Sequence, residues 1–216
     1  LDHRPYDLPP SRLDHLIHMS DETGIFQHAT FTVPNFFEGY CTDDNARAFI
    51  LCHALEELGD PAPAGLLEQL ATRYLAFLSA AWDGKQSRFR NFMSHGKVWL
   101  EPCGSEDSQG RALWALGSAV GRSKYQGHRR LAGRLFAAGL PIVQTFSSPR
   151  AWSFALLGIH EYLRAFPVDE KIGQIRTTLT EKLLHRWRDS QSQEWPWFEA
   201  SVTYENARLC QALIQS

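Results

Sequence analysis

The sequence has few cysteines and no long apolar run. Its 216 residues include only Cys41, Cys52, Cys103 and Cys210, and no two of these have the C-x-x-C spacing of a zinc or redox site. We therefore expect reduced, mostly buried thiols in a cytoplasmic protein. No stretch of about 18 apolar residues is present, so we expect no membrane-spanning helix. The chain begins at Leu1 rather than at a methionine, which leaves this expectation of localisation weakly defined.

The sequence also lacks a strong charge bias and the common catalytic motifs. The formal net charge is −2, and no basic stripe favours a nucleic-acid partner. There is no G-x-S-x-G elbow, P-loop or H-E-x-x-H motif, so a serine hydrolase, a nucleotide site and a zinc protease have no support. Asp43-Asp44 is followed by Asn45-Ala46-Arg47, which places a cation where a magnesium-binding D-D-x-x-D motif needs its third acid. We expect neither a metal ion nor a cofactor.

Helical periodicity dominates the chain after its first 42 residues. Apolar positions and turn residues predict helices at residues 43–58, 66–82, 105–120, 128–145, 149–166, 169–189 and 203–216. Asp43 or Asp44 is expected to cap the first of these helices, and Pro141 to kink or split the fourth. Short links alternate with the longer segments 83–104 and 191–201, as they do in repeated helical hairpins. Residues 1–42 form an irregular segment that we expect to pack on the domain at 43–216.

One short signature recurs at the starts of several predicted helices. Thr42-Asp43-Asp44-Asn45-Ala46-Arg47 matches Thr203-Tyr204-Glu205-Asn206-Ala207-Arg208, and Asp107-Ser108-Gln109-Gly110-Arg111 keeps the amide, the small residue and the arginine. An acid at a helix start suits the positive end of the helix dipole. The arginine can bind a carboxylate on the neighbouring repeat. The signature therefore predicts either ion pairs that hold the repeats together or a rim on which acids and amides converge.

The same residues carry a resemblance to a known superfamily. Residues 20–216 resemble the six-hairpin (α/α) toroid superfamily of carbohydrate-active proteins. The resemblance is carried by the runs 39–47, 91–93, 104–111 and 195–199. They resemble in particular a bacterial helical domain that occurs alone or appended to glycosyltransferase-like proteins. A closed toroid has about twelve helices and this sequence predicts about seven. The resemblance therefore implies an all-α fold that forms an open arc or an incomplete toroid.

Paired carboxylates at helix starts and tryptophan-containing loops predict a carbohydrate-active protein, and in the first place one that resembles a glycoside hydrolase. Glycoside hydrolysis requires two carboxyl groups, one of them protonated. The candidates are Asp43, Asp44, Glu106 and Asp107, with Asp44 and Asp107 as the preferred pair. Aromatic faces beside polar groups suit sugar rings, although tryptophan can equally fill a helical core. The residues expected to bind substrate are Asn45, Asn91, His95, Trp99, Trp195, Trp197, Glu199 and Tyr204.

Two other functions are compatible with the same residues. The chain could be a non-catalytic carbohydrate-binding or accessory domain that serves a glycosyltransferase, which needs the aromatic residues but no acid pair. It could also be a structural helical-repeat module whose loops bind a protein. The sequence specifies neither the sugar nor the linkage, because fold resemblance alone does not define a reaction.

Overall fold

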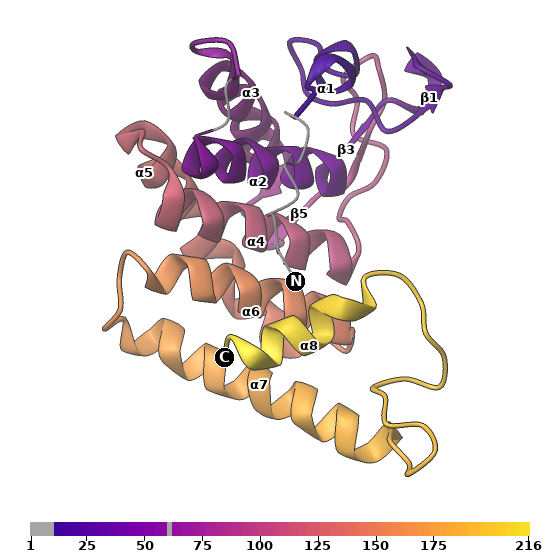
Figure 1. Ribbon diagram of the computed structural model, residues 1–216, viewed down its shortest axis with the longest axis vertical. Helices are drawn as coiled ribbons and strands as arrows, with labels where there is room; N and C mark the ends of the chain where they lie inside the picture. Colours follow the sequence, from indigo (N-terminus) through magenta and orange to yellow (C-terminus); the bar gives the residue numbers. More distant parts are fainter. Residues whose placement is uncertain (1–10, 60–61) are drawn as a thin grey trace, which may run out of the picture.

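The computed structural model describes residues 11–59 and 62–216, and these residues are mainly helical, as the sequence predicts (Figure 1). The remaining residues of the expected N-terminal segment, 1–10, and of the first link, 60–61, lie outside the described part. Eight α-helices occur in the described part: α1 Asp14–His18, α2 Thr42–Leu58, α3 Leu66–Ala81, α4 Glu106–Arg122, α5 Gln126–Gly139, α6 Pro149–Leu163, α7 Glu170–Ser190 and α8 Asn206–Ile214.

Most of the long helices begin at a side chain that caps them. Ser105, Ser148 and Asp169 each accept a hydrogen bond from a backbone N–H in the first turn of α4, α6 and α7, which satisfies a donor that the helix itself cannot. The expected cap of α2 was wrong: the cap is Cys41, whose sulfur accepts from the Asp44 N–H. Asp43 and Asp44 instead occupy the first turn of α2.

The fourth expected helix is split at Pro141, as predicted. Helix α5 ends at Gly139, and a 3₁₀ helix, η2 Pro141–Thr145, follows it. Proline lacks the N–H that would continue the α-helical hydrogen-bond ladder. Helix α8 begins a few residues later than expected, after Glu205, which has a left-handed backbone with φ of 54°.

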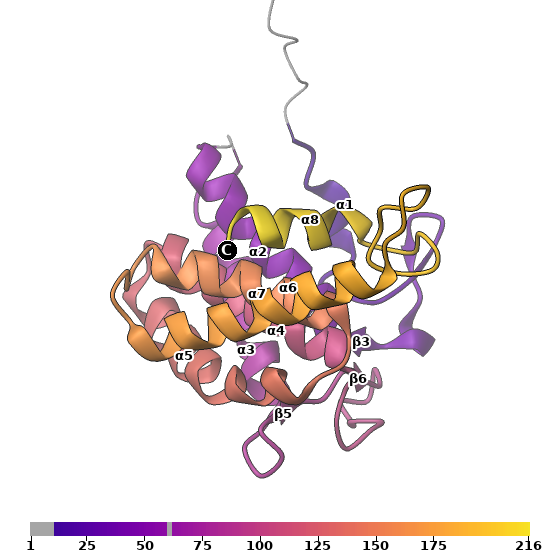
Figure 2. The same cartoon turned by 90° about the horizontal axis from the view of Figure 1, so that it is seen from below.

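The helices pack as hairpins around a row of helices that share one direction. The pairs α2–α3, α4–α5 and α6–α7 are in contact, and α4 also packs against both α2 and α6. Helix α8 packs on α6 and α7, and Figures 1 and 2 show it lying across the face of α6. The row is therefore α2, α4, α6 and α8, with α3, α5 and α7 on the outside.

Glycines bring α4 and α6 into very close contact. A side chain at Gly110, Gly117 or Gly121 would meet the backbone of Ala151, Gly158 or Glu161 respectively. The two helices therefore meet at matching steps along their lengths, so they run parallel. Helix α2 runs in the same direction as α4. Asp43 near the start of α2 pairs with Arg111 in the first half of α4, and Glu57 near the end of α2 pairs with Arg122 at the end of α4. The starts of α2, α4 and α6 consequently lie at the same end of the molecule.

Short strands and loops surround that end. The segment 11–42 contains α1, a small hairpin of β1 Ala29–Thr30 and β2 Val33–Pro34, a 3₁₀ helix η1 Phe36–Glu38, and β3 Tyr40–Cys41. The long link after α3 contains β4 Trp82–Asp83, β5 Arg88–Phe89 and β6 Phe92–Met93. Strand β3 pairs with β6 in antiparallel register. This pairing attaches the N-terminal segment to the link and positions the start of α2.

Candidate functional site

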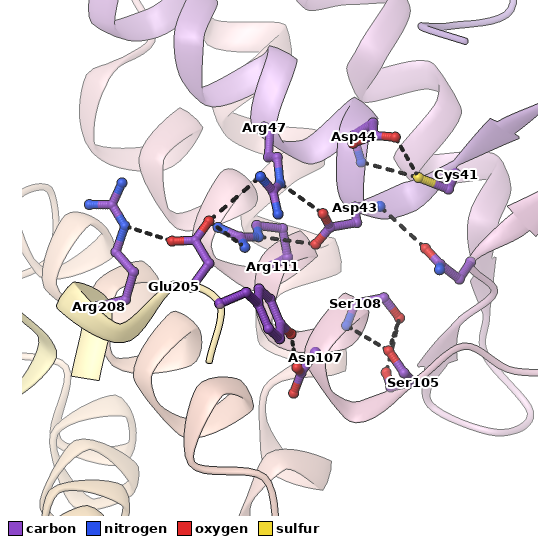
Figure 3. Close-up of polar contacts among 12 residues, drawn as sticks. Cys41, Asp43, Asp44, Arg47, Ser105, Asp107, Ser108, Arg111, Glu205 and Arg208 are labelled. Atoms are coloured by element: carbon purple, nitrogen blue, oxygen red, sulfur yellow. Dashed lines mark hydrogen bonds and ion pairs between the residues drawn. The ribbon is translucent and has the colours of Figure 1, made fainter. Parts of the chain in front are cut away.

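Polar side chains from the starts of α2, α4, α6 and α8 form two hydrogen-bonded groups. The first consists of Asp43, Arg47, Arg111, Glu205 and Arg208, and Figure 3 shows it beside Asp107. The second consists of Asp107, Ser148 and Tyr204, and it adjoins the first because Tyr204 precedes Glu205 in the chain. We call the two groups together the rim. The recurring signature thus marks helix starts that converge, as one of its two interpretations requires. The rim also contains the ion pairs that the other interpretation requires.

Arg111 is the centre of the rim. It projects from α4 and is almost fully buried, with 1% of its surface exposed. Its Nε donates to Asp43 on α2 at 3.0 Å, and its Nη2 donates to Glu205 before α8 at 2.9 Å. The guanidinium lies 3.8 Å from the centre of the Phe154 ring. A buried cation needs such partners because burial removes its water, so Arg111 links three helix starts.

Two more arginines surround the same carboxylates. Arg47 binds Asp43 at 2.8 Å and approaches Glu205 at 3.6 Å, while Arg208 binds the other oxygen of Glu205 at 3.2 Å. Burial alone would raise the pKa of Glu205, but Arg111, Arg208 and Arg47 outweigh it and lower that pKa. These arginines therefore favour the ionised form of Glu205, and two of them also pair with Asp43.

The two matching copies of the signature use their residues differently. Aligned acids Asp44 and Glu205 have different surroundings, because Glu205 lies inside the rim and Asp44 does not. Asn45, expected to bind substrate, is buried, and its amide accepts from the Ile25 N–H at 3.1 Å and donates to the Cys41 carbonyl at 2.8 Å. Asn206 instead accepts from the Thr203 N–H. The similarity of the two copies therefore predicts that both lie at the same end of the molecule, but it does not predict which hydrogen-bond partners their residues have.

Asp107 and Glu106 connect the start of α4 to that of α6. Asp107 accepts hydrogen bonds from the hydroxyls of Ser148 and Tyr204. Burial and the neighbouring Asp107 raise the pKa of Tyr204. One oxygen of Glu106 accepts from the backbone N–H groups of Ser147 and Ser148 at 2.9 and 2.7 Å. Glu106 therefore fixes the turn before α6.

The loop 191–201, which contains Trp195 and Trp197, is attached to α6 by Arg150. Its two terminal nitrogens donate to the two oxygens of Glu199 at 2.8 and 2.7 Å, a bidentate pair. The Arg150 guanidinium also lies 4.9 Å from the centre of the Tyr204 ring. Trp195 donates to the Glu199 carbonyl and keeps 39% of its surface exposed. Trp197 packs partly against the core.

The other residues expected to bind substrate lie around the link after α3. Asn91 is buried, and its amide oxygen accepts from the Asp43 N–H at 3.3 Å. His95 stacks on Phe36 with ring centres 4.9 Å apart. Trp99 packs edge-on against Phe77. Asn91 thus supports the start of α2, whereas no contact joins His95 or Trp99 to the rim.

Asp44 is separate from the rim. Its carboxylate accepts a hydrogen bond from the Cys41 thiol at 3.0 Å, and burial raises the pKa of Asp44. It lines a cavity between α1 and α2, and Asp107 does not line that cavity. Asp44 and Asp107, the preferred catalytic pair, therefore share no hydrogen-bond partner and do not line this cavity together. Their catalytic role stays a prediction.

Sequence reasoning missed the aromatic support beneath Arg111. Trp114 and Phe154 stack on each other with ring centres 6.1 Å apart, and both lie next to the Arg111 guanidinium. Arg208 also lies over Trp114, at 4.8 Å. The spacing from Arg111 to Trp114 is three residues, which places both on one helix face. That spacing was the available signal for Trp114, but no local pattern indicated Phe154.

Other features bear on the chemistry available. Within residues 11–59 and 62–216, no group of three or more His, Cys, Asp or Glu side chains is arranged to hold a metal ion. No helix in that part of the chain combines the length and the apolar character that crossing a membrane requires. All four cysteines are free thiols, and Cys41 and Cys52 are buried.

Comparisons of the chain with protein families, curated proteins and solved structures find no match.

Proposed function

We propose that this chain is a carbohydrate-binding helical domain that holds its ligand at the rim. The observation that carries the proposal is the convergence of four helix starts on the fixed polar side chains of the rim, where Tyr204 is partly exposed. Trp195 is also partly exposed, and it donates to the carbonyl of Glu199, the residue that Arg150 at the start of α6 binds. A sugar ring presents hydroxyl groups in several directions and an apolar C–H face. Fixed carboxylates and guanidinium groups can bind the hydroxyls, and an exposed aromatic ring can stack on the face.

The contacts of the rim acids favour binding over hydrolysis. Asp43 and Glu205 are paired with arginines, and Glu199 is held by both terminal nitrogens of Arg150. A general acid must carry a proton when it meets its substrate, whereas the arginines around Glu205 lower its pKa and so favour its ionised form. Paired in this way, the acids act as fixed hydrogen-bond acceptors.

The resemblance to six-hairpin toroids supports the same class of ligand. Within this proposal, the row of parallel helices corresponds to the inner helices of an incomplete toroid. A glycosyltransferase domain or protein stays a proposed partner, supported by the resemblance alone.

A glycan array tests the proposal. We expect the wild-type chain to bind at least one class of glycan and Trp195→Ala to lose most of that signal. A matched control is Phe37→Ala, because Phe37 is also an exposed aromatic residue but lies in the 3₁₀ helix η1, away from the loop 191–201. A blank array for the wild-type chain would refute carbohydrate binding and favour the structural helical-repeat module.

Glycoside hydrolysis is a second candidate, and one observation favours it. Burial raises the pKa of Asp44, which is the direction that a general acid requires. A panel of 4-nitrophenyl glycosides tests this candidate, since cleavage releases a coloured phenolate. Activity that disappears in both Asp44→Asn and Asp107→Asn would support hydrolysis, whereas turnover unchanged in both would refute the proposed pair.

A further inference from the structure

A cavity of about 490 Å³ lies between α1 and α2, beside the rim. Its volume falls within the usual range for small-molecule sites. Its walls are mainly apolar and come from Leu16, Met19, Ile25, Phe26 and Leu51. Leu51 belongs to this apolar lining and keeps 40% of its surface exposed. The cavity is therefore open to solvent at Leu51 and offers an apolar surface to a ligand that enters there.

Asp44 is the acceptor at the polar side of this cavity. Among the described residues, no arginine, lysine or histidine lies within ion-pair distance of Asp44, and its carboxylate accepts only from the Cys41 thiol. A thiol is a weak hydrogen-bond donor. A carboxylate has two oxygens and room for several donors. Asp44 therefore keeps acceptor capacity that a bound ligand could use.

The surroundings of Asp44 favour an uncharged donor. Arg12 and Arg47 also line the cavity, but each is already paired with a carboxylate, Arg12 with Asp14 and Arg47 with Asp43. The other walls are mainly apolar, and a hydroxyl can donate to Asp44 without bringing a further charge against them. Arg47 connects the cavity to the rim, because the same side chain binds Asp43 and approaches Glu205.

We infer that this cavity binds an apolar group that carries a hydroxyl, which donates to Asp44. The adjoining position of the rim identifies the class of full ligand as a glycoside with an apolar aglycone. That second part rests on the proposed function, since it places the sugar on the rim. The first part concerns the cavity alone.

Benzyl alcohol and toluene test the cavity without any sugar. They have the same ring, but only benzyl alcohol has a hydroxyl donor. In NMR titrations of the full chain, we expect saturable binding of benzyl alcohol that is about tenfold tighter than that of toluene. Equal affinities, or no saturable binding of benzyl alcohol, would overturn the inference.

Two kinds of variant locate the binding. Leu51→Trp fills the cavity from its exposed side and should weaken benzyl alcohol binding at least tenfold. Leu58→Trp is the matched control, because Leu58 is on the same helix, is 81% exposed and lies outside the cavity. Asp44→Leu should remove the preference for benzyl alcohol over toluene while toluene still binds. Binding that is unchanged in Leu51→Trp, or a preference that survives in Asp44→Leu, would contradict the assignment.

Benzyl and methyl glycosides of the same sugars test the link to the rim. We expect the benzyl glycoside of a sugar that binds to have the higher affinity, and Leu51→Trp to abolish the difference between the two. Equal affinities would refute the link and leave carbohydrate binding at the rim intact. If neither glycoside of any sugar binds, the proposed function fails together with the link, and the benzyl alcohol titration decides the cavity on its own.

Discussion

Replacing Arg111 by leucine should destabilise the fold strongly, because this arginine holds three helix starts together. The variant removes two charge-assisted hydrogen bonds, at 3.0 and 2.9 Å, from a side chain with 1% exposure. Breaking a buried ion pair by removing one partner costs about 3–5 kcal/mol. Arg47 and Arg208 stay near Asp43 and Glu205 and offset part of the loss. We therefore expect the free energy of unfolding to fall by about 3 kcal/mol.

Urea unfolding followed by circular dichroism measures this change. For a chain of this length, about 3 kcal/mol corresponds to a fall in melting temperature of roughly 6–12 °C. Arg208→Leu is the matched control, because Arg208 also binds Glu205 but its side chain is 38% exposed. Exposed ion pairs contribute at most about 1 kcal/mol to stability. If the two variants lose equal stability, or Arg111→Leu loses less than about 1 kcal/mol, the rim is not held by Arg111.

Two further predictions concern packing and pH. Gly117→Ala should lower the free energy of unfolding, measured in urea, by at least about 2 kcal/mol, because the added methyl group meets the Gly158 backbone. The control is Gly173→Ala, which should be neutral or stabilising because nothing lies within 4 Å of the added methyl group. Similar losses in both variants would contradict the close packing of α4 and α6. Burial, with His128 and Arg122, lowers the pKa of His53 to about 4. As the pH falls from about 7 to 4, His53 therefore becomes protonated in the unfolded chain before it does so in the folded chain. This difference should lower the free energy of unfolding by roughly 3 kcal/mol over that range. Unfolding measured from pH 7 to 4 should show a shallower decline in His53→Leu, and identical slopes would refute this origin.

The sequence predicted helices well because each carries its own local signals. Ser105 and Ser148 cap α4 and α6, and serine is a residue type that favours this position. Pro141 splits a helix for a reason local to its ring. The cap of α2 was predicted wrongly. The acids Asp43 and Asp44 are better caps by type, but the pairing of β3 with β6 fixes the backbone two to three residues earlier, at Cys41.

The site was predictable in location but not in its contacts. Repeated helix starts indicated a shared rim, because hairpins of similar length bring alternate starts to the same end. Which acid of each pair faces the rim depends on the twist of α2 against α4, and no local pattern encodes that. Asp43 therefore reaches Arg111 while Asp44 faces the cavity beside α1. The separation of Asp44 from Asp107 is likewise a property of the packed helices alone.

Hydrogen–deuterium exchange with and without a bound glycan tests most directly the claim that the rim holds carbohydrate. The ligand would be taken from the glycan array, at a concentration that saturates the chain. If the rim binds the glycan, we expect protection in the loop 191–205 and at the starts of α4 and α6, with little change in the hairpin at 29–34. Protection confined to that hairpin or to the outer helices α3, α5 and α7 would contradict binding at the rim.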